Sequence, residues 1–389
     1  MWFHTLFSIS LLSVAVSAVP YKPGGSSLKP FSTFSNVTIF TPPANYTDPR
    51  TLYARTVELE NGVLLATWEN YSPEPPLVYF PIYKSTDGGE TWKMISKITD
   101  QVNGWGLRYQ PFLYELPVTV GNFSAGTILA AGNSIPTDLS LTQIDIYASR
   151  DKGYTWEFVS KVADGGAAIP DNGIPAIWEP FLFYYKGEII CYYSDQRNPL
   201  YGQNLVHTTS SDLVSWAPIV PDVEYSTYTA RPGMTTVTHL PNGSYIMTYE
   251  YGGGPDWGNV TDYEFPVYYR ISDSPLTFNE SIGHPVVANG IHPTSSPYVT
   301  WSPIGGPHGT ILVSSGSLTQ IFLNTELGAV DAWKVADTPA SVSYTRSLRV
   351  FKDHPNHVLI AGGGKLPPST TNKVTVSVID LEQTLAQAK

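Results

Sequence analysis

The 389-residue sequence has almost none of the residues that make covalent or metal cross-links. Cys191 is its only cysteine, which excludes an internal disulfide and a cysteine-based metal site, so packing alone must hold the core together. Three histidines, His284, His292 and His308, lack the spacing of metal ligands, and no G-x-S-x-G signal of a serine nucleophile occurs. We therefore expect a protein without a metal or a cofactor.

Positive charge is also scarce, because 22 Lys and Arg face 33 Asp and Glu, for a formal net charge of -11. This balance argues against nucleic acid or an acidic membrane surface as a partner. No apolar run is long enough to cross a bilayer. Residues 1–18 carry a short apolar run ending in Val16-Ser17-Ala18, a pattern typical of signal peptides. We expect secretion, and one mature domain over residues 19–389.

Glycosylation sequons support the expectation of export, because N-x-S/T is modified only on chains that enter the secretory pathway. The seven sequons are at Asn36, Asn45, Asn70, Asn122, Asn242, Asn259 and Asn279. Composition adds a fold class: aromatics at 13 %, charged residues at 14 %, 32 Gly, 33 Pro and short runs rich in Val, Ile and Tyr favour all-β structure.

An internal repeat defines the architecture. Residues 85–92 (STDGGETW) and 149–156 (SRDKGYTW) share the pattern S-x-D-x-G-x-T-W, which resembles the Asp-box of sialidase-like propellers. The Asp is expected to bond turn amides, the Gly to supply positive φ, and the Trp to pack between neighbouring sheets. The boxes are therefore interpreted as structural turns away from any active site.

Degenerate boxes follow at residues 210–216, 272–278 and 332–333. The closing aromatics, at intervals of 64, 60, 62 and 55 residues, are Trp92, Trp156, Trp216, Phe278 and Trp333. That spacing divides the mature chain into six units. The last unit, residues 374–379, lacks a box, and the early strand at 37–40 precedes the first unit. We expect a six-bladed β-propeller whose N-terminal strand closes the ring by completing the sixth blade.

Each unit is predicted to open with an inner strand beside the central channel, where propellers bind ligands. The six inner strands begin near Tyr53, Arg108, Ile177, Ala230, Ser295 and Tyr344. Four charged residues, Arg55, Glu179, Arg231 and Arg346, fall on them, and Glu250 lies at a second-strand end whose counterpart in the first unit is Glu69. An ionised Glu179 between aromatics is costly without compensation, which marks it as a candidate for function. A structural ion pair with an arginine is the alternative, and it is the preferred reading for Glu69.

Two carboxylates at one sugar ring suffice for glycoside hydrolysis without a cofactor. One donates a proton to the leaving oxygen while the other attacks the anomeric carbon or activates water. Glu179 and Glu250 are the predicted pair, and the sequence alone leaves open a retaining separation of about 5 Å or an inverting one of about 7–9 Å.

From about Asn36 to the C-terminus the chain resembles the fungal exo-arabinanases of glycoside hydrolase family 93. The resemblance is carried by residues 53–62 (YARTVELENG), 177–181 (IWEPF) and 249–253 (YEYGG), together with the boxes. It implies a six-bladed propeller and a retaining enzyme that releases arabinobiose from the non-reducing end of linear α-1,5-L-arabinan.

The resemblance also implies roles for single residues. Glu179 matches the nucleophile and Glu250 the acid/base, with Tyr251 and Trp257 expected to raise the pKa of Glu250. The other expected substrate-site residues are Tyr344 as a hydrogen-bond donor to the nucleophile, Arg55, Arg231 and Arg346 as charges that keep it ionised, and Trp105 and Trp178 as stacking surfaces. Segments 100–106 and 164–175 are expected to wall off one end of the cleft.

Two alternatives remain at this level. A sialidase would also carry inner-strand arginines and a tyrosine nucleophile, for which Tyr344 is available, but Arg55 is followed by Thr56-Val57 instead of the usual R-I-P or R-L-P. A non-catalytic sugar-binding propeller should repeat its special residues in every blade, and here they differ from blade to blade. We expect an enzyme acting on a polysaccharide or oligosaccharide as a monomer.

Overall fold

The computed structural model describes residues 31–254 and 264–389. The predicted signal segment, Trp257 and the sequon at Asn259 lie outside these residues. Residues 32–389 form one compact unit. Among the described residues, no helix has the length and apolar character needed to cross a membrane.

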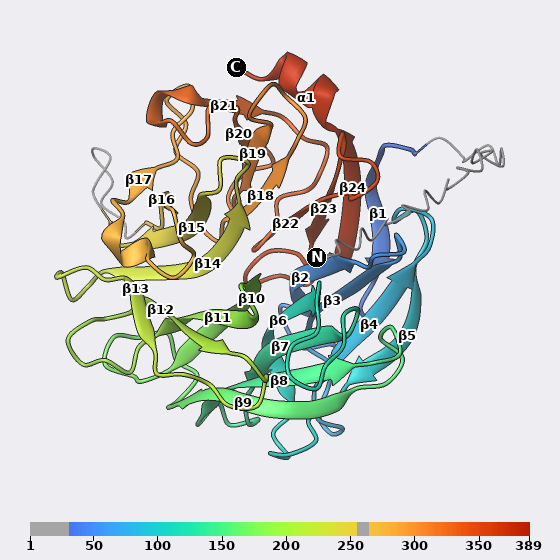
Figure 1. The fold of residues 1–389 in the computed structure, drawn as a ribbon. Coiled ribbons are helices and arrows are strands. Elements are labelled where there is room, and N and C mark those ends of the chain that lie inside the picture. Colours follow the sequence, from blue (N-terminus) through green and yellow to red (C-terminus); the bar gives the residue numbers. More distant parts are fainter. Residues whose placement is uncertain (1–30, 255–263) are drawn as a thin grey trace, which may run out of the picture. The chain divides into compact units, whose positions relative to one another are not determined.

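Within the described ranges, six four-stranded antiparallel sheets surround a common centre (Figure 1). The first blade contains β2 (Thr51–Glu58), β3 (Leu64–Asn70), β4 (Phe80–Ser85) and β5 (Lys93–Ile98), and the second contains β6 (Leu107–Glu115), β7 (Ile128–Ser134), β8 (Thr142–Ser149) and β9 (Glu157–Gly165). The third contains β10 (Ile177–Tyr185), β11 (Glu188–Asp195), β12 (Asn204–Ser210) and β13 (Val220–Val223). The first strand of each is the inner strand.

The fourth blade contains β14 (Arg231–His239), β15 (Tyr245–Gly252), β16 (Val267–Ser272) and β17 (His284–Pro285), and the fifth contains β18 (Tyr298–Ser302), β19 (Thr310–Ser314), β20 (Ile321–Asn324) and β21 (Trp333–Ala336). The sixth contains β22 (Ser347–Val350), β23 (His357–Gly362), β24 (Val374–Asp380) and, as its outer strand, β1 (Phe34–Phe40). The short helices η1 (Phe278–Glu280), η2 (Val330–Ala332) and α1 (Leu381–Gln387) lie between or after these strands. The predicted six-bladed propeller is confirmed.

The N-terminal strand closes the ring as the sequence predicted. β1 pairs antiparallel with β24, with Phe34 opposite Val378 and Phe40 opposite Val374. Because β24 would otherwise be an edge strand with unpaired amides, this pairing joins the two ends of the unit and covers that edge. Figure 1 shows the blue and red strands side by side in one sheet.

Both complete boxes form the expected turns. Asp151 Oδ1 accepts hydrogen bonds from the Thr155 and Tyr154 amides at 2.8 and 3.0 Å, and Gly153 has φ of 91°. Trp156 Nε1 reaches Ser96 Oγ of the preceding blade at 3.2 Å. The boxes therefore fix their own hairpins and also tie neighbouring blades together.

Degenerate boxes keep the turn by other means. In the fifth blade Asn324 accepts hydrogen bonds from the Glu326 and Gly328 amides, both at 2.9 Å, in place of an aspartate. In the fourth, Ser272 Oγ and Thr277 Oγ1 bond to each other at 2.8 Å, and among the described residues Asp273 makes no hydrogen bond. An amide in the fifth blade and two hydroxyls in the fourth thus replace the aspartate, whereas the third-blade box keeps Asp212, whose Oδ1 accepts the Val214 and Ser215 amides.

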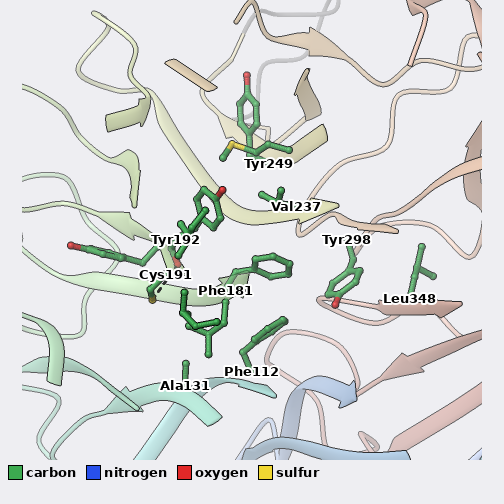
Figure 2. Packing of buried hydrophobic residues seen from close by; sticks show 14 of the residues in the cluster. Phe112, Ala131, Phe181, Cys191, Tyr192, Val237, Tyr249, Tyr298 and Leu348 are labelled. Atoms are coloured by element: carbon green, nitrogen blue, oxygen red, sulfur yellow. Dashed lines mark hydrogen bonds between the residues drawn. The ribbon is translucent and has the colours of Figure 1, made fainter. Parts of the chain in front are cut away.

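Large side chains from different inner strands fill the centre of the ring. The rings of Phe112 and Phe181 lie 4.6 Å apart between centroids, and those of Phe181 and Tyr298 lie 6.3 Å apart (Figure 2). Val237 and Leu348 belong to the same buried cluster. The channel is therefore packed below its mouth.

Candidate active site

A cavity of about 620 Å³ occupies the mouth of the ring. Its walls come from the starts of inner strands, the ends of second strands and the loops between blades. The lining residues are Asp48, Pro49, Leu52, Glu69, Tyr71, Tyr109, Gln110, Ala168, Pro170, Trp178, Glu179, Gln203, Arg231, Glu250, Phe265, Ser295, Tyr344, Leu366 and Pro367. Both predicted carboxylates face this single cavity.

At least one non-glycine residue with positive φ occurs near the start of every inner strand, and in the fifth blade Ser295 has it as well as Ser296. One such residue from each blade, with φ of 53°, 57°, 64°, 62°, 43° and 58°, gives the set Tyr53, Gln110, Glu179, Met234, Ser296 and Thr345. In the first four blades this residue lies in a break of the strand register, where two residues face one on the partner strand. Such a bulge frees the amide from the sheet ladder, and its conformation costs about 1 kcal/mol or more unless neighbouring groups hold it.

The freed amides bond across the blade boundaries. In five blades the bulge N–H donates to a side chain of the preceding blade at 2.6–3.0 Å. The pairs, donor first, are Gln110 with Glu69, Glu179 with Gln110, Met234 with Glu179, Ser296 with Glu250, and Thr345 with Ser296. These hydrogen bonds form two runs at the mouth, from Glu69 to Met234 and from Glu250 to Thr345, and together they hold all three cavity glutamates.

Glu179 is held as an acceptor. Its Oε2 accepts hydrogen bonds from Ser194 Oγ at 2.6 Å and from the Met234 amide at 2.8 Å. Burial raises the pKa of Glu179 above its ordinary value, while these two hydrogen bonds and the charges of Arg231 and Arg55 act against the rise. The contacts therefore stabilise the ionised form of Glu179 in a buried place.

Glu250 has fewer supports. Its Oε2 accepts one hydrogen bond among the described residues, from the Ser296 amide at 2.6 Å. Burial and then the charge of Glu179 raise the pKa of Glu250 to about 8, although Arg231 opposes this. Glu250 is therefore protonated at neutral and acidic pH, while Glu179 has the hydrogen-bond donors of an anion.

Gly233 leaves the space between the two acids open. A Cβ atom at Gly233 would lie 3.5 Å from Glu179 Oε2 and 3.5 Å from Glu250 Oε1, so these oxygens are separated by no more than twice that distance. This limit includes the separation of about 5 Å used by retaining glycosidases and only the short end of the inverting range.

Of the other predicted residues, Arg231, Trp178 and Tyr344 line the cavity. Arg231 donates to Asn172 Oδ1 at 2.7 Å and to Gln203 Oε1 at 2.8 Å, so amide side chains orient its charge. The Tyr344 hydroxyl contacts Met234 Sδ at 3.7 Å and makes no hydrogen bond with Glu179 among the described contacts. The expected support of the nucleophile by Tyr344 is therefore supplied by Ser194 instead.

Two predicted arginines do not reach the cavity. Arg346 is fully buried and donates to the carbonyls of Thr319 and Gln320 at 2.7 and 2.8 Å, so it holds a loop and does not contact substrate. Arg55, also buried, donates to the Ala54 and Thr345 carbonyls, with its guanidinium 4.0 Å from the centre of the Tyr53 ring. Arg55 contributes charge from beneath the site without touching the ligand space.

Two predicted aromatics, Tyr251 and Trp105, and one of the two predicted wall segments, residues 100–106, do not line the cavity. Tyr251 stacks on Tyr225 with ring centroids 3.8 Å apart, and it does not line the cavity. Trp105 belongs to a loop held by Asp100, whose Oδ2 accepts the Trp105 amide at 2.6 Å, and segment 100–106 contributes nothing to the cavity lining. Segment 164–175 does form a wall, through Ala168 and Pro170. Trp257 lies outside the described residues.

Ser194, which the sequence reasoning missed, occupies the position in the repeat that Glu250 occupies in the fourth blade. Glu69, Asn133, Ser194 and Glu250 all lie opposite the residue that precedes the bulge. Aligning second strands as carefully as inner strands would have found Ser194. Among the described residues, no group of three or more His, Cys, Asp or Glu side chains is arranged to hold a metal ion.

Comparison with solved structures finds two fungal glycoside hydrolases of nearly the same length. The family 93 α-L-arabinofuranosidase of Fusarium graminearum, solved with arabinobiose, is 56 % identical with a TM-score of 0.90. The α-L-arabinanase of Penicillium chrysogenum, also solved with arabinobiose, is 53 % identical with a TM-score of 0.88. Each match covers 91 % of this chain and 99 % of the other.

More distant matches share only the fold. The NanB sialidase of Streptococcus pneumoniae is 12 % identical with a TM-score of 0.54, over 92 % of this chain and 71 % of that one. No protein-family model and no curated protein sequence matches the chain.

Proposed function

The chain belongs to glycoside hydrolase family 93, and from this membership and the geometry of its site we propose that it releases arabinobiose from the non-reducing end of linear α-1,5-L-arabinan. The observation that carries the proposal is the pair of buried glutamates in one cavity, Glu179 with the contacts of an anion and Glu250 with a pKa raised to about 8. Glycosidases need this division between an ionised carboxylate and a protonated one.

The proposed reaction has two steps. Glu179 attacks the anomeric carbon and forms a glycosyl ester while the bond to the leaving oxygen breaks and Glu250 gives that oxygen its proton. Glu250, now a carboxylate, then takes a proton from water, the water oxygen attacks the anomeric carbon, and Glu179 leaves as a carboxylate. Arg231 lowers the pKa of both acids, because its charge favours each ionised form. The anomeric configuration is retained.

Exo action is proposed from the shape of the cavity. Asp48 and Pro49, ahead of the first blade, and Leu366 and Pro367, in the sixth, line the cavity together with Ala168 and Pro170 of the loop between the second and third blades. Loops that wall a cavity on several sides favour binding of a chain end over binding of the middle of a polymer. A cavity of about 620 Å³ is of the size that small ligands occupy.

Digestion of linear arabinan tests the proposed function. We expect arabinobiose as the first and main product. Proton NMR of the β/α ratio at the new reducing end should show that the anomeric configuration is retained. Glu179→Gln should abolish release. A ladder of longer oligosaccharides at early times would refute exo action, and intact arabinan would refute the substrate.

We also propose that the protein is secreted as a glycosylated monomer, because β1 covers the edge of β24 and several sequons are accessible. Asn45, Asn122, Asn242 and Asn279 are exposed, whereas Asn70 is 3 % exposed. Peptide mass spectrometry of protein from a fungal secretion host should find glycans at some of the four exposed sites and none at Asn70. A glycan at Asn70, or retention of the protein inside the cells, would contradict this.

A further inference from the structure

A third glutamate, Glu69, faces the same cavity from the end of β3. It occupies the place in the first blade that Glu250 occupies in the fourth, since each lies opposite the residue before the bulge. Its side chain is 4 % exposed. The sequence favoured a structural ion pair for this residue, and the contacts of Glu69 show something different.

Among the described residues, Glu69 makes no ion pair. Its Oε1 accepts the Gln110 amide at 2.9 Å and its Oε2 accepts the Tyr71 hydroxyl at 2.7 Å. Burial raises the pKa of Glu69 to about 7, and the charge of Glu179 adds to the rise. An acid in this position is costly, and a glutamine, with one carbonyl oxygen, would bury more cheaply if the only task were to order the loop.

Each carboxylate oxygen has room for a second hydrogen bond. A carboxylate offers about four acceptor sites, and the contacts within the described residues use two of them. Because Glu69 lines the cavity, the remaining acceptor capacity is available to a ligand. Carboxylates bind hydroxyl groups through short, charge-assisted hydrogen bonds.

Aromatic rings flank Glu69 on the same side of the cavity. Tyr71 and Tyr109 both line it, with ring centroids 6.1 Å apart and planes inclined by 40°. Carboxylate acceptors beside tyrosine rings suit a sugar, which has both hydroxyl groups and apolar C–H faces. Around the ring the order is Glu69, Glu179 and Glu250, in the first, third and fourth blades. Glu69 thus lies on the side of Glu179 away from the acid that protonates the leaving group.

We propose that Glu69 recognises the glycon, by accepting hydrogen bonds from two hydroxyl groups of the arabinobiose released from the chain end. The inference rests on the proposed function and adds a specificity-determining residue to it. Glu69 then acts by contact with the sugar, and it is not needed to position Glu179 through Gln110.

Binding separates these two roles when the reaction is blocked. In a Glu179→Gln background, which cannot form the glycosyl ester, the Kd of α-1,5-linked arabinotriose is measured by titration calorimetry at pH 8, where Glu69 is ionised. Adding Glu69→Gln should weaken binding about 10- to 100-fold, the effect of losing charge-assisted hydrogen bonds. Glu58→Gln is the matched control, because Glu58 is also 4 % exposed but does not line the cavity. It should leave Kd unchanged.

Deoxy ligands test the contact from the side of the sugar. Within a series of arabinotrioses that each lack one glycon hydroxyl, at least one should bind the Glu179→Gln protein about 10-fold more weakly, and lose no further affinity when Glu69→Gln is added. If the double variant does not fold, full affinity of every deoxy ligand for the single variant overturns the proposal.

An unchanged Kd in the double variant overturns the role of Glu69, and so does a loss of kcat in Glu69→Gln alone with Kd retained, which would indicate action through Gln110. Either result leaves the proposed function standing if the unaltered protein releases arabinobiose. Failure of the unaltered protein to cleave arabinan, with no binding of arabinotriose by Glu179→Gln, rejects both.

Discussion

At the scale of single residues, Glu179 and Glu250 are buried acids that differ in their contacts. Glu179 accepts hydrogen bonds from Ser194 and Met234, and positive charge compensates it further. Glu250 accepts a single hydrogen bond among the described residues and feels the negative charge of Glu179. The proposed roles, Glu179 as nucleophile and Glu250 as acid/base, rest on these different neighbours, which the sequence does not reveal because both residues are glutamates.

Glu250→Gln tests this assignment through the leaving group. A glutamine cannot donate the proton, so we expect cleavage of linear arabinan to fall by about 10²- to 10⁴-fold. The leaving group of an aryl substrate whose aryloxide has a low pKa needs no proton. For that substrate the rate of the first step should fall much less. The kcat/KM of the unaltered enzyme should fall above pH about 8, where Glu250 ionises. In the variant, kcat/KM should show no such decrease at high pH. Equal losses on both substrates would contradict an acid role for Glu250.

At the scale of elements, the bulge in each inner strand and the box in each outer hairpin solve different problems. The bulge presents a side chain to the mouth and an amide to the preceding blade, as Glu179 does with Gln110. The box stabilises a hairpin whose turn is distant from the cavity lining. Function and stability are thus carried by separate elements of the same blade.

Substitution of box aspartates should therefore alter stability without altering catalysis. Asp151→Ala removes the acceptor of the Thr155 and Tyr154 amides and should lower the free energy of unfolding by about 1–2 kcal/mol. Asp273→Ala, in the degenerate fourth-blade box, should change it little, because Asp273 makes no hydrogen bond among the described residues. Chemical denaturation measures both. A change in kcat/KM for either variant would show that the boxes reach the site.

At the scale of the whole molecule, the buried acids couple the stability of the ring to pH. Glu69, Asp145 and Glu250 have their pKa raised by burial to about 7, 7 and 8. Each binds its proton more tightly when folded than when unfolded. The proton therefore adds to the free energy of unfolding at low pH, and this contribution is lost as the pH rises through the folded-state pKa. Box aspartates such as Asp87 and Asp151 have lowered pKa values, so their contribution is lost only in strong acid.

We accordingly expect the thermal midpoint of unfolding to be highest near pH 5 and to fall between pH 5 and pH 8, by the equivalent of a few kcal/mol in total. His357, whose pKa is lowered by burial, acts in the opposite direction over the lower part of this range. In the double variant Glu69→Gln/Glu250→Gln, the thermal midpoint should depend less on pH. Calorimetric scans at several pH values decide this, and a midpoint at pH 8 equal to that at pH 5 would contradict it.

The sequence by itself determined the number of blades and the closing strand, and it selected two acids, Glu179 and Glu250, that line one cavity. Those features depend on local rules: an S-x-D-x-G-x-T-W turn forms from its own residues, and its spacing counts the blades. Glu179 and Glu250 could be selected because the repeat assigns each to a strand end at the mouth.

Only the tertiary structure decided which side chains meet there. Arg231 lines the cavity while Arg346 and Arg55 do not, although the sequence assigned all three to inner strands. Ser194 and Gln110 hold Glu179 through contacts between strands and blades that are 15 and 69 residues apart in sequence. These contacts depend on the left-handed bulges and on the rotation of one blade against the next, and hydrophobic alternation and turn patterns specify neither.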